Sequence, residues 1–206
     1  DAGTIQSELT LPEALKITDI FLTHSHLDHL IDLPFLFDAT FEARNQNLVD
    51  AVTLAKNYTK DFDGFFLVTG PTGVGKTHLA LAIAGIRIKK SLPVYFSFMP
   101  NLLDKLRRSF DLENSSSKID FEEIINFPFL ILDDLGSEKS SNWTDGKIYQ
   151  IIVQRHNLKL PTVITTRNIE ENPFDYGQYT EGIRSRLNDN GIVNAIHIGS
   201  PDYRSN

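Results

Sequence analysis

A glycine-rich stretch, GPTGVGKT at residues 70–77, constrains the fold of this chain more than any other feature. It follows the apolar run Phe65–Val68 and precedes an apolar segment with helical periodicity at residues 79–84. Strand, glycine turn and helix in this order make a phosphate-binding loop, because the glycines let backbone N–H groups surround phosphate oxygens at the positive end of the helix. Lys76 is expected to reach the β- and γ-phosphates, and the Thr77 hydroxyl to ligate Mg²⁺. The predicted nucleotide-binding residues are Gly70, Pro71, Thr72, Gly73, Val74, Gly75, Lys76, Thr77 and His78.

A second apolar run, beginning at Phe129, ends in the acidic pair Asp133 and Asp134. A buried parallel strand is apolar throughout, and its C-terminal end opens onto the ligand crevice of an α/β sheet. We therefore expect Asp133 to hold Mg²⁺ and Asp134 to orient or polarise the attacking water. An apolar run before two acids is common by itself, and it becomes informative here because a phosphate loop lies upstream.

Strand-like and helical segments alternate along residues 46–206. The strands are predicted at residues 64–69, 94–98, 129–133, 162–166 and 192–198. This alternation predicts an α/β fold, a five-stranded parallel sheet with helices on both faces. The fourth strand ends in hydroxyls that would lie between the phosphate loop and the acidic pair. Thr166 and Asn168 are therefore candidate catalytic residues near the γ-phosphate.

Residues 1–45 contain an unrelated signal, the motif HSHLDH at residues 24–29 after a strand-like segment at 17–22. Imidazole and carboxylate groups at this density suit Zn²⁺ and similar metals. The candidate ligands are His24, His26, Asp28 and His29. About 45 residues are too few to build a complete metallo-hydrolase domain, so we interpret residues 1–45 as an incomplete fragment and residues 46–206 as the nucleotide-binding domain.

Composition excludes several classes of protein. The net charge of −7 gives no overall basic surface for nucleic acid, so any DNA contact has to be local. The chain has no cysteine, no apolar run long enough for a membrane helix and no visible signal peptide, which favours a cytoplasmic protein. It begins with Asp1 rather than Met, and we expect it to be a piece of a longer protein.

The motifs GPTGVGKTHLA, FLILDDLG, LPTVITT and GIRSRL together resemble the DnaC/DnaI/IstB-like branch of the AAA+ ATPases, over about residues 46–206. The resemblance implies ATP and Mg²⁺ as ligands, and a replicative helicase loader or a transposition-helper ATPase as the function. It makes Arg184 or Arg186 the arginine finger that completes a neighbouring subunit's site, and so implies a homo-oligomer. The implied partner is a replicative helicase or another DNA-bound protein. Lys105, Arg107 and Arg108 fall where this family contacts single-stranded DNA.

Two features depart from this pattern or compete with it. The family has Asn directly after Thr-Thr, whereas Arg167 here precedes Asn168. The DAGT and THSHLDHLIDLPFL stretches resemble the class II cyclic-nucleotide phosphodiesterases of the metallo-β-lactamase superfamily. The alternatives are therefore a metal-dependent phosphodiesterase carried by residues 1–45 and a nucleotide-switched binding module without turnover.

Overall fold

The computed structural model describes residues 19–22, 46–111, 121–137, 141–167 and 181–199. These residues form one sheet of order β1-β3-β4-β5-β2-β6. Its strands are β1 (Asp19–Leu22), β2 (Phe65–Thr69), β3 (Val94–Phe98), β4 (Leu130–Leu135), β5 (Thr162–Thr166) and β6 (Val193–His197). The pairs among β2 to β6 are all parallel, which confirms the predicted five-stranded parallel sheet. Strand β1 adds an antiparallel edge beside β3.

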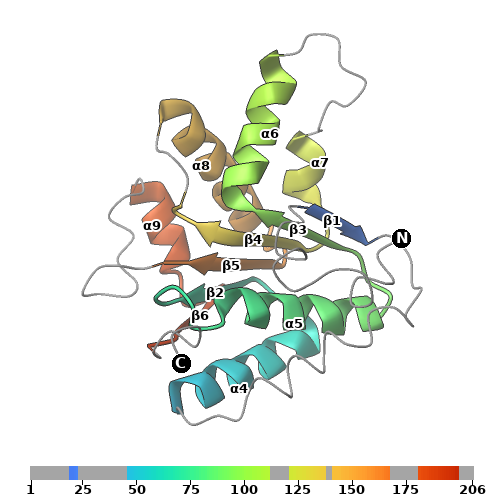
Figure 1. Cartoon of the computed structure of the whole chain (residues 1–206), viewed down its shortest axis with the longest axis vertical. Helices are drawn as coiled ribbons and strands as arrows, with labels where there is room; N and C mark the ends of the chain where they lie inside the picture. The colour runs from blue at the N-terminus through green and yellow to red at the C-terminus, as the bar shows by residue number, and fades with distance from the viewer. Residues whose placement is uncertain (1–18, 23–45, 112–120, 138–140, 168–180, 200–206) are drawn as a thin grey trace.

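Helices cover both faces of the sheet (Figure 1). Helices α4 (Gln46–Asp61) and α5 (Lys76–Lys89) lie on one face. Helices α6 (Met99–Asp111), α7 (Phe121–Asn126), α8 (Asn142–Asn157) and α9 (Glu181–Leu187) lie on the other. None of the helices in the described ranges is long and apolar enough to cross a membrane.

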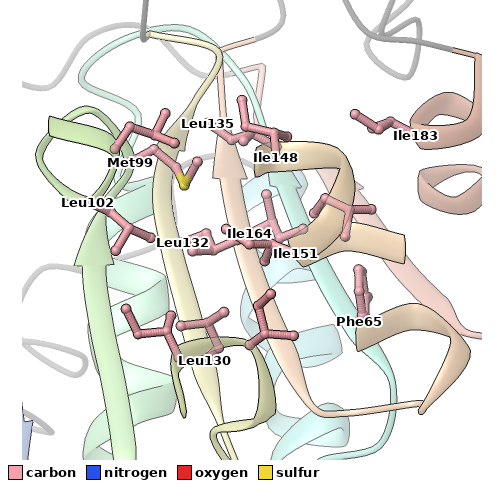
Figure 2. Close-up of a cluster of buried hydrophobic side chains, with 14 of the residues drawn as sticks. Phe65, Met99, Leu102, Leu130, Leu132, Leu135, Ile148, Ile151, Ile164 and Ile183 are labelled. Carbon is pink, nitrogen blue, oxygen red and sulfur yellow. The ribbon is translucent and has the colours of Figure 1, made fainter. Parts of the chain in front are cut away.

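The strands divide the core in two because successive side chains point to opposite faces of a sheet. In β2, Phe65 and Leu67 join the core under α6 to α9, whereas Phe66 and Val68 join the core under α4 and α5. Figure 2 shows the first of these cores, in which Ile148 and Ile151 of α8 meet side chains of β4 and β5. Burial on both faces explains why the strands are apolar throughout rather than alternating.

Strand β4 runs past the two acidic residues at which it was predicted to end. Its partner β5 advances from Ile164 to Thr166 while β4 advances from Leu132 to Leu135, so β4 contains one extra residue. Asp134 has a left-handed φ of 62°, and Leu135 takes the buried position in the core under α6 to α9. Bulges are common beside active sites, where they re-aim a side chain.

Strand β1 confirms part of the strand expected at residues 17–22. It belongs to the segment that we assign to a metallo-hydrolase fragment, yet it pairs with β3 in the same sheet as the phosphate loop. The metal-ligand candidates His24, His26, Asp28 and His29 lie outside the described residues. The boundary between residues 45 and 46 stays a prediction.

Candidate nucleotide-binding site

The loop between β2 and α5 has a backbone that only glycine adopts without strain. Gly70 has a φ of 147°, and a Cβ atom there would lie 2.3 Å from the carbonyl oxygen of Ile198. Gly75, with a φ of 94°, is the N-cap of α5. These glycines bring the chain close to the end of β6 and then start a helix of 14 residues, whose first N–H groups point back into the loop.

Lys76 is folded onto this loop. Its Nζ atom donates hydrogen bonds to the carbonyl oxygens of Gly70 (2.8 Å) and Pro71 (2.6 Å), and the residue is 8% exposed. The ammonium group therefore lies inside the loop, where a phosphate chain would compete with the two carbonyls for it. Val74 is buried in the core under α4 and α5, so only its backbone is available to a nucleotide. His78 follows in the first turn of α5.

Thr77 and Asp133 meet across the sheet edge as the sequence predicts for a magnesium site. The Thr77 hydroxyl lies 3.0 Å from Oδ1 and 3.1 Å from Oδ2 of Asp133. A hydroxyl and a carboxylate are hard oxygen ligands of the kind that Mg²⁺ binds together with water and phosphate. These two residues therefore fit the metal that the phosphate loop implies.

Thr165 connects the two acidic residues. Its hydroxyl donates to Oδ1 of Asp133 (2.7 Å) and accepts from the backbone N–H of Asp134 (2.9 Å). Burial raises the pKa of Asp133, and hydrogen bonds from Thr165 and Thr77 oppose that rise. Thr166, the predicted catalytic hydroxyl, is buried and donates to the Leu135 carbonyl (2.6 Å). The strand end thus reaches the acids through Thr165, which the sequence analysis did not select.

Arg167 is a second residue that the sequence analysis did not assign to the site. Its Nε and Nη2 atoms donate to the two carboxylate oxygens of Asp134 at 2.9 and 2.7 Å. The sequence showed Arg167 only as an interruption before Asn168, which lies outside the described residues. Strand β5 lies between β2, which leads into the loop, and β4, which carries the acids. A cation directly after such a strand is the sequence signal that could have identified Arg167.

His197 is a third addition, at the end of β6. Its Nδ1 atom lies 3.0 Å from the Thr69 hydroxyl, one residue before the phosphate loop. Burial lowers the pKa of His197, and the positive charge of Lys76 lowers it further. The imidazole is therefore predominantly neutral at neutral pH, beside a loop whose charge comes from Lys76.

The two arginine-finger candidates differ in their contacts. Arg186 donates from Nη1 to the carbonyl oxygen of Gly182 in its own helix (2.9 Å). Both Arg184 and Arg186 have a buried Nε atom without a hydrogen-bond partner in the described part of the chain. Within the described residues, this bond to Gly182 distinguishes Arg186 from Arg184.

The three cations of α6 are also unequal. Arg107 lies over the Trp143 ring, 5.1 Å from its centroid, and its Nη2 atom is 3.4 Å from the Thr144 hydroxyl. Arg107 thus helps to hold α6 against the start of α8. Lys105 is half-buried and burial lowers its pKa, whereas Arg108 is exposed. Arg107 and Arg108 are both exposed, and Arg107 differs from Arg108 in its contact with the Trp143 ring.

The parallel sheet, the glycine loop at the end of β2 and the Thr77–Asp133 contact define a P-loop nucleotide-binding protein. The sequence profile of the family described as "IstB-like ATP binding protein" matches residues 21–181. The chain belongs to this family. The match starts within β1, so it includes part of the segment that we assign to the N-terminal fragment.

Two relatives show the range of this family. The replicative helicase loader DnaC of Escherichia coli (strain K12) is 28% identical over 127 residues, which are 60% of this chain and 52% of DnaC. An ATP-binding protein of the insertion sequence IS5376 from Geobacillus stearothermophilus is 29% identical over 130 residues, 62% of this chain and 51% of the relative. The chain therefore spans about half the length of the curated relatives that it matches.

Solved structures share the fold of this chain. The crystal structure of the DnaC helicase loader has a TM-score of 0.67 and 26% identity, and the match covers 80% of this chain and 98% of that one. The structure of DnaI, with a TM-score of 0.61 and 23% identity, shares the fold. The predicted kinship with DnaC and DnaI is confirmed. The metal-dependent phosphodiesterase alternative receives no support from these comparisons.

Proposed function

We propose that this chain is a Mg²⁺-dependent ATPase of the helicase-loader type, which uses ATP to load or remodel a DNA-bound partner. The observation that carries the proposal is the convergence of the Lys76 loop, the Thr77 hydroxyl and the Asp133 carboxylate at one edge of the sheet. The kinship with DnaC supports the loader class. Because the match covers about half of DnaC, the partner is part of the proposal.

The loop and the acidic strand would supply the groups that bind the nucleotide and its metal ion. Lys76 would exchange the carbonyls of Gly70 and Pro71 for phosphate oxygens, and Asp133 and Thr77 would hold Mg²⁺, which neutralises phosphate charge when bound. Water would attack the γ-phosphorus, forming one P–O bond as the bond to the bridging oxygen breaks and ADP leaves. Asp134 would orient that water and accept its proton.

The test is ATP binding and turnover by the purified chain and two site variants. Lys76→Ala removes the charge inside the loop, and we expect ATP affinity to fall by about 10- to 100-fold. Asp134→Asn keeps the shape of the side chain, and we expect binding to persist while turnover falls by about 10²- to 10⁴-fold. Lys89→Ala, at the far end of α5, is the matched control.

The outcomes distinguish the candidate functions. Turnover by Lys76→Ala equal to that of the unchanged chain would refute an active site in this loop. Tight ATP binding without turnover, at concentrations that favour oligomers, would instead identify a nucleotide-switched binding module.

For the arginine finger we favour Arg184 over Arg186, because Arg186 already donates to Gly182 in its own helix. A finger that acts in a neighbouring subunit requires a homo-oligomer. We expect an inactive Arg184→Ala chain and an inactive Lys76→Ala chain to recover turnover when they are mixed, because each supplies what the other lacks. If mixtures stay inactive at every ratio, Arg184 does not act across a subunit interface.

For the partner we favour a replicative helicase, with single-stranded DNA contacted through α6. Arg108 is exposed, whereas Arg107, also exposed, packs on Trp143. We expect Arg108→Gln to weaken DNA binding and to lower its salt dependence by about one counterion. The kinship with an insertion-sequence protein keeps a transposition helper as the second candidate. ATP-dependent binding of a purified helicase or of a transposase tells the two apart.

A further inference from the structure

The ion pair between Arg167 and Asp134 engages the carboxylate on which the proposed hydrolysis depends. The guanidinium forms two parallel bonds of 2.9 and 2.7 Å, one to each carboxylate oxygen. Paired in this way, a guanidinium and a carboxylate fix each other's orientation. The carboxylate of Asp134 is therefore directed at Arg167 instead of at a water molecule near a nucleotide.

The backbone around Asp134 maintains this arrangement. The bulge gives Asp134 its left-handed φ of 62°, and the residue's N–H donates to the Thr165 hydroxyl. Its carbonyl oxygen accepts from the hydroxyl of Ser137 at 2.7 Å. The Asp134 backbone is thus held on both sides, and the Arg167 side chain has more room to turn away from the pair. The Arg167 side chain is 47% exposed, against 14% for Asp134.

The position of Arg167 in the sheet brings it next to the phosphate loop. Thr166 of β5 pairs with Thr69 of β2, and the next residues along these parallel strands are Arg167 and Gly70. Neighbouring strands lie about 4.8 Å apart. A long cationic side chain at that point can reach either the carboxylate of Asp134 or the terminal phosphate of a nucleotide in the loop.

We propose that Arg167 is a latch that reads the γ-phosphate. It holds Asp134 in the nucleotide-free chain and releases it when a nucleoside triphosphate, but not a diphosphate, fills the loop. To bind the γ-phosphate the guanidinium would turn toward the loop, which takes its Nε and Nη2 donors away from Asp134, so the two anions compete for it. The inference rests on the proposed nucleotide site. It adds that Arg167 keeps Asp134 away from water until a nucleoside triphosphate is bound.

The test is a double-mutant cycle on binding rather than on turnover. Dissociation constants for ADP and for a non-hydrolysable ATP analogue, both with Mg²⁺, are measured for the unchanged chain, Arg167→Gln, Asp134→Asn and the double variant. Arg167→Gln removes the γ-phosphate contact, so we expect the ATP analogue to bind about threefold to tenfold more weakly, which is the usual range for a partly exposed ion pair. ADP binding should not change. Asp134→Asn frees Arg167 and should strengthen analogue binding.

The coupling between the two changes decides the outcome. In the Arg167→Gln background, Asp134→Asn should strengthen analogue binding by a clearly smaller factor, because no latch remains to be opened. Additive effects on analogue binding, or equal effects on ADP and analogue, would overturn the latch. Failure of the unchanged chain to bind either nucleotide would instead refute the proposed function. Lys89→Gln, which removes one exposed cation far from the loop, serves as the charge control.

Discussion

Arg155 tests how this sheet is held together, because its side chain is completely buried and has no carboxylate partner among the described residues. It donates to the Thr162 hydroxyl (2.8 Å) and to the carbonyl oxygens of Ile125 (2.6 Å), Phe127 (2.8 Å) and Pro161 (2.7 Å). Burial lowers its pKa to about 9, which still leaves the guanidinium charged at neutral pH. One side chain thus joins α8, the end of α7 and the start of β5.

The cost of replacing Arg155 by Met follows from these bonds. Pro161 keeps a donor in the Leu130 N–H, but Ile125 and Phe127 lose the donor from Arg155. Each buried carbonyl left unsatisfied costs about 1–3 kcal/mol, and relief of the buried cation offsets part of the total. We expect a loss of about 3 kcal/mol from a total stability on the order of 5–15 kcal/mol.

Thermal unfolding measures this prediction directly. A loss of 3 kcal/mol in a chain of this size corresponds to a fall in Tm of about 6–12 °C. Arg155→Lys keeps the charge but offers three donors without the planar guanidinium fork. Its Tm should therefore lie between those of the unchanged chain and Arg155→Met. Lys89→Met, an exposed change of similar size, should stay within about 0.5 kcal/mol. An Arg155→Met chain as stable as the unchanged one would show that the network provides no net stabilisation.

Three further changes test the site. Asp133→Asn should stabilise the nucleotide-free chain at neutral pH, because burial raises the pKa of this carboxyl. The gain in Tm should shrink as the pH falls, because the carboxyl of the unchanged chain becomes protonated. A gain in Tm that is constant with pH would contradict this cause. Thr165→Val removes the hydroxyl between Asp133 and the Asp134 N–H and should cost about 1–3 kcal/mol in denaturant unfolding, whereas an unchanged midpoint would mean that water replaces it. Gly70→Ala would place a methyl group against the Ile198 carbonyl, so we expect a loss of about 2–4 kcal/mol and of ATP binding; a stable chain that binds ATP would show that the loop can relax.

The sequence predicted the sheet and indicated candidate residues for the site because their signals are local. Apolar runs identify buried strands, and the spacing of glycines with Lys76 identifies a phosphate loop. The contact between Thr77 and Asp133 followed from the rule that parallel strands end at one edge.

Features that depend on register or on tertiary contacts were not accessible in this way. The bulge at Asp134 arises from the pairing of β4 with β5, and it extends β4 beyond its predicted end. Nothing in the local sequence around Arg155 showed that carbonyls from two other segments surround it. The pairing of Arg167 with Asp134 depends on the same register.

Calorimetric titration of ATP with and without Mg²⁺, into the unchanged chain and into Thr77→Val, tests the central claim most directly. We expect Mg²⁺ to strengthen ATP binding to the unchanged chain, and Thr77→Val to remove most of this gain in affinity. The reason is that the Thr77 hydroxyl and the Asp133 carboxylate are both proposed ligands of the metal. The same gain from Mg²⁺ in both proteins would contradict a metal site at Thr77 and Asp133.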